Sequence, residues 1–164
     1  MSANRHSIVF DTNVLLDYFL PWREQAAGAK ELVGLALQKD VAILYPVHAI
    51  KDVFYLISGS MKQKCREDTG GLTESQALAA QAAAWGCVES IRQNATAIGA
   101  DESDVWLACK YRGLSGDLED NMVMAAAQRA QADFLVTSDG ALLRKSTVRT
   151  HTVEDAISLL KLIA

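Results

Sequence analysis

Short apolar segments that alternate with long helical ones restrict the fold of this 164-residue chain more than any other feature. Residues 7–10, 41–45 and 134–137 have the apolar character of buried strands, and residues 147–151 form a weaker fourth candidate. This order is typical of a parallel sheet with helices on both faces. The sequence therefore predicts an α/β fold, a three-layer α/β/α sandwich around a central parallel sheet of about 4–5 strands.

End signals mark the helices between these strands. Residues 22–38 and 48–63 carry apolar side chains at helical spacing, and the capping box Thr73–Gln76 opens an alanine-rich helix. Gly70–Gly71 lies between the last two of these helices, so we expect them to form a long helical hairpin. Capping residues begin three further helices: Asp101, Asp117 and Thr152.

Length and composition lead us to expect one domain, residues 1–164, in a reducing cytoplasm. The three cysteines are odd in number and far apart, which fits neither a disulfide framework nor a zinc-binding pair. No signal-peptide pattern is present, nor an apolar run of the roughly 18–20 residues that span a membrane. A net charge of -4 argues against a broad basic surface but not against a nuclease, because bound divalent cations offset acidic clusters.

Acidic residues stand at the ends of predicted strands or at the starts of neighbouring helices. In a parallel sheet the carboxyl ends of the strands meet at one edge, where ligands bind. Separate segments supply acids near that edge: Asp11 after the first strand, Asp52 after the second, Asp117 and Asp120 before the third, and Asp139 after it. Neighbouring carboxylates raise one another's pKa, and Mg²⁺ or Mn²⁺ relieves the repulsion. Such ions activate water and stabilise a phosphodiester during displacement.

Helix capping and turn formation offer simpler explanations for some of these acids. Asp11 precedes a helix, but Asn13 is also placed to cap it, which would leave Asp11 for a site. Asp139 is followed by glycine, which is a common turn pair. Asp17 is predicted to be either solvated or a supporting residue behind the site, and Glu119 is predicted to face away from it.

Asp117 and Asp120 have the same spacing as Asp101 and Asp104. We interpret the pair at 101 and 104 as helix caps, with acids near the positive end of the helix dipole. The same interpretation fits the pair at 117 and 120. Spacing alone therefore leaves both interpretations open for that pair.

Three stretches of the sequence resemble a known family: "IVFDTNVLLDYF" (8–19), "YPVHAIKDVFYLI" (45–57) and "DLEDNMVMAAAQRAQADFLVTSDGALL" (117–143). In this order they are similar to PIN-domain proteins, the family of the VapC-type toxin ribonucleases and related 5′-nuclease-like enzymes. The resemblance covers nearly the whole chain.

The resemblance implies a role for each acid. Asp11, Asp120 and Asp139 match metal-binding positions of the family, with Asp117 as an auxiliary ligand. Asp52 stands where the family usually has glutamate and would act as a catalytic acid through water, because its side chain is one methylene shorter. Polar neighbours of these acids are expected to contact phosphate: Asn13, Thr137 and Ser138.

By the same resemblance, the chain is expected to be a metal-dependent endoribonuclease that uses Mg²⁺ or Mn²⁺ to hydrolyse RNA. As a VapC-type toxin it would have a small antitoxin protein as its partner, form a homodimer and not associate with a membrane. The alternative is a catalytically weak or inactive PIN-like module that binds RNA or protein, which Asp52 in place of glutamate supports. Phosphoryl transfer of the haloacid-dehalogenase kind is disfavoured, because Asn13 replaces the second acid of its D-x-D motif.

Overall fold

A computed structural model describes residues 5–163 of the chain. Five strands form one sheet in the order β3-β2-β1-β4-β5, and every neighbouring pair is parallel. The strands are β1 (Ser7–Phe10), β2 (Ala42–Pro46), β3 (Thr96–Ile98), β4 (Phe134–Val136) and β5 (Thr150–His151). The chain adds β2 and β3 on one side of β1 and then β4 and β5 on the other, so the strand order reverses between β1 and β4.

The predicted strands are confirmed with small changes in their bounds, and the fourth shortens to β5. Strand β3 was not predicted from the sequence. This strand has three residues, and two of them are exposed. It therefore lacks the apolar pattern that identifies a buried strand, and its pairing with β2 alone defines it.

The described residues also form eight α-helices and a short 3₁₀ helix. Their bounds are α1 (Thr12–Phe19), α2 (Ala26–Gln38), α3 (Ala49–Thr69), α4 (Glu74–Asn94), α5 (Glu102–Lys110), η1 (Tyr111–Gly113), α6 (Leu118–Arg129), α7 (Gly140–Lys145) and α8 (Val153–Leu162). None of the helices in this part of the chain is long and apolar enough to cross a membrane.

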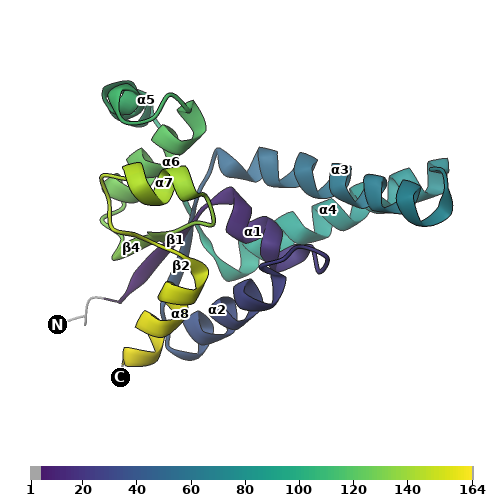
Figure 1. The fold of residues 1–164 in the computed structure, drawn as a ribbon, viewed down its shortest axis with the longest axis horizontal. Coiled ribbons are helices and arrows are strands. Elements are labelled where there is room, and N and C mark those ends of the chain that lie inside the picture. The colour runs from purple at the N-terminus through teal and green to yellow at the C-terminus, as the bar shows by residue number, and fades with distance from the viewer. Residues whose placement is uncertain (1–4, 164) are drawn as a thin grey trace.

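Alternate residues of β1 point to opposite faces of the sheet and enter two separate apolar cores. Ile8 and Phe10 pack in a core that includes residues of α1, α2, α3, α4 and α8. Val9 packs in a second core with residues of α6 and α7. Helices therefore cover both faces, which confirms the predicted three-layer sandwich (Figure 1).

The long hairpin is also confirmed, and α3 and α4 lie side by side as they extend away from the sheet (Figure 1). Helix α3 continues past its predicted end at residue 63 to Thr69, and Gly70 caps it with a left-handed φ of 75°. The predicted capping box of Thr73 and Gln76 begins α4. A glycine at the turn and a cap after it thus reverse the chain direction within a few residues.

Candidate active site

Asp11 lies at the switch point between the two central strands, which is where ligands bind in open parallel sheets. Its backbone N–H donates to the carbonyl of Val136 at 3.0 Å, so β1 and β4 are joined up to this residue. Its Oδ1 accepts from the N–H of Thr12 at 2.7 Å, and its Oδ2 accepts from Oγ1 of Thr137 at 2.7 Å. The residue is only 6% exposed.

The pKa of Asp11 is raised to about 6, mainly by burial and to a smaller extent by the nearby carboxylates of Glu119 and Asp120. The hydrogen bonds from Thr137 and Thr12 oppose this rise because they stabilise the charged form. The structure thus holds an acid in surroundings that disfavour its negative charge. A positive charge bound nearby would reverse that preference.

Asp11 is itself the N-cap of α1, with extended backbone angles and a side chain that accepts from the first helical N–H. The prediction that Asn13 caps this helix and frees Asp11 is therefore wrong. Asn13 lies inside the first turn, after the position whose side chain can fold back onto the helix end. One oxygen of Asp11 caps the helix, while the other faces the hydroxyl of Thr137.

Thr137 connects two of the predicted acids. Its fully buried hydroxyl donates to Oδ2 of Asp11 and accepts from the backbone N–H of Asp139 at 3.0 Å. Asp139 in turn caps α7, and its Oδ1 accepts from the N–H groups of Ala141 at 2.6 Å and Leu142 at 3.0 Å. The loop after β4 therefore sets the positions of Asp11 and Asp139 together.

Asp120 lies in the first turn of α6 and belongs to the same electrostatic group. Burial raises its pKa, and the charges of Asp117 and Asp139 raise it further, whereas a 3.4 Å hydrogen bond from Ser115 lowers it. Asp117 is the N-cap of α6 and accepts from the N–H groups of Glu119 at 2.8 Å and Asp120 at 3.3 Å. The capping interpretation of Asp117 is thus correct, and its charge still acts on Asp120.

Glu119 is an additional member of the group, and the prediction that it faces away is wrong. Its Oε1 accepts from Oγ1 of Thr12 at 3.2 Å, and its charge contributes to the raised pKa of Asp11. The contact joins residues that are 107 positions apart in the sequence. No local spacing could have indicated it, because it depends on how the fold places the first turn of α6 next to the start of α1.

Asp52 lies in the first turn of α3, and its Oδ1 is 3.4 Å from Nζ of the exposed Lys51. Its negative charge affects the pKa of His48. The charges of the described residues that shift the pKa of Asp11 and Asp120 do not include that of Asp52. Burial lowers the pKa of His48, which the nearby acids Asp104, Glu119 and Asp52 oppose. Asp52 and Glu119, a member of the group around Asp11, thus both act on the pKa of His48.

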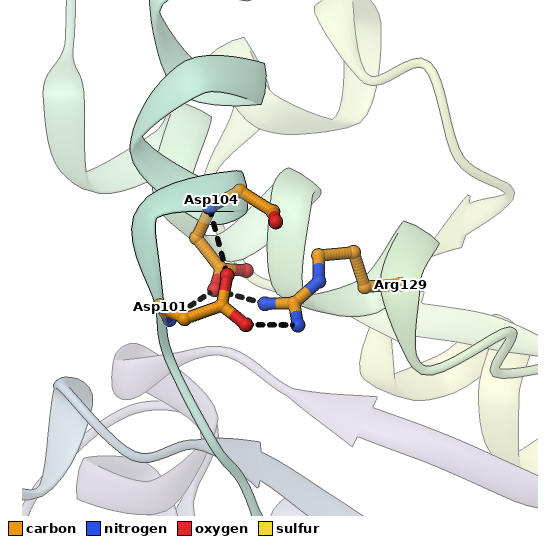
Figure 2. A network of polar contacts seen from close by, with 4 residues as sticks. Asp101, Asp104 and Arg129 are labelled. Carbon is orange, nitrogen blue, oxygen red and sulfur yellow. Dashed lines mark hydrogen bonds and ion pairs between the residues drawn. The ribbon is translucent and has the colours of Figure 1, made fainter.

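The pair Asp101 and Asp104 forms a capping box at the start of α5, as predicted. Arg129 from the end of α6 also binds both carboxylates, and Figure 2 shows its guanidinium group facing the two of them from one side. By contrast, no arginine or lysine among residues 5–163 forms an ion pair with Asp117 or Asp120. The two pairs share their spacing, and the presence of a basic partner distinguishes them.

Asp17 is buried on α1 and pairs with Arg23, whose Nε donates to Oδ1 at 2.5 Å. The interpretation of Asp17 as a solvated acid is therefore wrong. Among its alternatives, a supporting role next to the site agrees with the structure, since Asp17 shares a cavity with Ser138.

The acids around Asp11 offer only carboxylate oxygens, which are the ligands that Mg²⁺ and Mn²⁺ prefer. Within the described residues, no three His, Cys, Asp or Glu side chains are already arranged as a metal cage. Instead, three of the acids each use Oδ1 to cap the helix that follows them: Asp11, Asp117 and Asp139. The donor set fits a hard cation in its chemistry, and a bound ion would draw on the second oxygens of these residues.

The fold and the site together define an α/β protein with an acidic site at the carboxyl edge of its parallel sheet. The sequence profile described as PIN domain matches residues 7–141, and the chain belongs to this family. Proteins of the family are generally nucleases that use divalent metal ions. No curated protein sequence matches the chain.

Solved structures share the fold. VapBC2 from Rickettsia felis, crystallised with a DNA fragment from its promoter, aligns with a TM-score of 0.64 at 12% identity, over 89% of this chain and 98% of that chain. PAE2754 from Pyrobaculum aerophilum aligns with a TM-score of 0.56 at 19% identity, over 95% of this chain and 90% of that chain. These likenesses confirm the PIN fold.

Proposed function

We propose that the protein is a metal-dependent endoribonuclease that hydrolyses phosphodiester bonds of RNA. One observation carries the proposal: the charge of Asp120 raises the pKa of Asp11, the charge of Asp139 raises the pKa of Asp120, and no basic side chain among the described residues forms an ion pair with these acids. Such a group is unfavourable by itself and becomes favourable when a divalent cation binds. Membership of the PIN family supports nuclease chemistry at this site.

Asp11, Asp120 and Asp139 would hold Mg²⁺ or Mn²⁺, with Asp117 as an auxiliary ligand. When bound, the ion supplies a Lewis acid that activates water and stabilises the charge on a reacting phosphodiester. Thr137 orients Asp11 through its hydroxyl, because the hydrogen bond to Oδ2 fixes the carboxylate rotamer. Thr12 does the same for Glu119.

The remaining predicted residues surround this centre. Asn13 and Ser138 offer neutral hydrogen-bond donors for phosphate oxygens, and both lie one or two positions from an acid of the site. Asp52 would accept a proton from water at the start of α3, where it is 36% exposed and can exchange that proton with solvent. These assignments give each polar residue at the sheet edge a separate task.

The fold shared with VapBC2 supports a toxin role, in which a small antitoxin protein would mask the site and two copies of the chain would form a homodimer. A cytoplasmic location fits this role. Copurification of the chain with the product of the neighbouring reading frame, followed by loss of RNA cleavage in the complex, would test the partner directly.

The nuclease proposal is tested with a labelled single-stranded RNA, incubated with and without Mg²⁺ or Mn²⁺. We expect Asp11→Asn to slow metal-dependent cleavage by at least about 100-fold, because it removes a ligand charge from the centre. Asp68→Asn is the matched control, since Asp68 is exposed on the hairpin and pairs only with Lys64 among the described residues. Undiminished cleavage by Asp11→Asn would refute the assignment.

A catalytically weak or inactive PIN-like module is the second candidate. The acid at position 52 favours it, because Asp52 is shorter than the family's usual glutamate and forms an ion pair with Lys51. Calorimetry with Mn²⁺ separates the two candidates. The nuclease binds the ion in a manner that Asp11→Asn abolishes, whereas the inactive module shows no such binding.

A further inference from the structure

Arg23 lies in the loop between α1 and α2, next to the acidic site. Its Nε donates to Oδ1 of Asp17 at 2.5 Å, and the side chain of Asp17 is 3% exposed. A buried carboxylate is unfavourable unless it is paired, so this contact holds the arginine firmly. Oδ2 of Asp17 has no hydrogen-bond partner in the part of the chain that the structure describes.

The contact through Nε leaves the two terminal nitrogens of Arg23 available. Its side chain is 34% exposed, and no hydrogen bond from these nitrogens is present among residues 5–163. The planar guanidinium group is therefore oriented in advance, with one edge on Asp17 and the other free for a ligand. Such an arrangement suits the two-pronged binding of a phosphate group.

A cavity of about 350 Å³ lies beside Arg23 and is also lined by Asp17, Glu24, Gln25 and Ser138. Its volume falls in the range of small-ligand sites and is large enough for a phosphate with its sugar. Arg23 neutralises Asp17, and the exposed Glu24 can turn its carboxylate to solvent. The donors that remain are a guanidinium group, an amide and a hydroxyl.

Ser138 places this cavity directly next to the acidic site, because it stands between Thr137, which holds Asp11, and Asp139. A smaller cavity of about 110 Å³ shares Gln25 and Ser138 and continues to the start of α8. The two cavities follow the carboxyl edge of the sheet. An extended chain with regularly spaced phosphates could therefore lie along this edge.

We propose that Arg23, with Ser138 and Gln25, binds a backbone phosphate of single-stranded RNA adjacent to the phosphate that is cleaved. Asp17 is a positioning residue that holds the guanidinium group in place. The inference rests on the proposed nuclease function, and it solves an electrostatic difficulty of that function. A polyanion must approach a group of carboxylates, and the free N–H groups of an oriented guanidinium at the border of that group give one of its phosphates a hydrogen-bonding partner there.

The test measures both binding and cleavage of one labelled RNA oligonucleotide. Arg23→Gln keeps a hydrogen-bond donor near Asp17 but removes the charge, and Arg92→Gln is the matched control on the exposed face of α4, where Arg92 pairs with Glu89. We expect Arg23→Gln to raise the half-saturating RNA concentration about tenfold, with the rate at saturation unchanged. The slope of log affinity against log salt concentration should fall by about 0.7, the value for one phosphate contact in a single strand.

Should Arg23→Gln unfold, the double variant Asp17→Asn with Arg23→Gln removes both charges and leaves no buried carboxylate unpaired. Equal half-saturation and equal salt slopes in the Arg23 and Arg92 variants would overturn the inference, as would a loss confined to the rate at saturation. Fluorescence anisotropy measures binding of the same RNA to the Asp11→Asn protein, and so tests the phosphate contact separately from cleavage. If the wild-type chain does not cleave RNA, the nuclease proposal fails, and the anisotropy of Arg23→Gln still decides the phosphate contact.

Discussion

Asp11 should make the metal-free protein less stable at neutral pH than at acidic pH, and Asp11→Asn should remove that dependence. Burial is the main reason that the pKa of Asp11 is raised to about 6 from its ordinary value of 3.8. The unfolded chain therefore releases the proton near pH 3.8, while the folded chain retains it up to about pH 6. Between these values the folded state binds more protons, so its stability falls as the pH rises.

The size of the effect follows from the two pKa values. Each tenfold change in proton affinity corresponds to about 1.36 kcal/mol, so the interval from 3.8 to about 6 gives a loss of roughly 3 kcal/mol. The loss is absent below pH 3.8 and complete above pH 6. For a domain with a typical stability of about 5–15 kcal/mol, such a change is easily measured.

The assay is urea unfolding followed by circular dichroism, in the presence of a chelator, at intervals from about pH 4 to pH 7.5. The stability of the wild-type chain relative to Asp11→Asn should fall by about 2–3 kcal/mol over this range. Asp68→Asn should follow the wild type. Adding Mn²⁺ at pH 7.5 should restore stability to the wild type and not to Asp11→Asn. A difference between the two proteins that is constant with pH, or that grows in the opposite direction, would refute the reasoning.

Two further substitutions test other contacts of the site and of its capping counterpart. Thr137→Val removes the hydroxyl that faces Asp11, which should lower the free energy of unfolding by about 1–3 kcal/mol and slow cleavage about 10–100-fold. Thr137→Ser keeps the hydroxyl and should keep both the stability and the cleavage rate. Equal cleavage rates for the two variants would contradict this. Arg129→Met leaves the buried Asp104 without its cation and should cost about 3 kcal/mol in urea unfolding, while Arg92→Met at an exposed pair should change stability by no more than about 0.5 kcal/mol. A similar small effect for both arginines would show that the network in Figure 2 does not stabilise the fold.

The sequence alone predicted the sheet, the hairpin and the edge at which the acids gather. These features depend on signals between near neighbours: an apolar run before Asp11, a capping box at Thr73 and a glycine at position 70. The common edge of the sheet can also be predicted from the sequence, because the carboxyl ends of parallel strands all lie on the same side. The assignment of Asp11, Asp120 and Asp139 to one metal site also depends on the resemblance to the family, and it stays a prediction.

Only the tertiary structure decided what each polar group touches. Two pairs of acids have the same spacing in the sequence, Asp101 with Asp104 and Asp117 with Asp120. They differ in the structure because the far end of α6 brings Arg129 to the first pair. The same dependence on packing explains why Glu119 reaches Thr12. Local spacing determines where an acid stands in a helix or turn. Whether the charge of that acid is neutralised depends on residues far apart in the chain, which the arrangement of α5, α6 and α1 brings together.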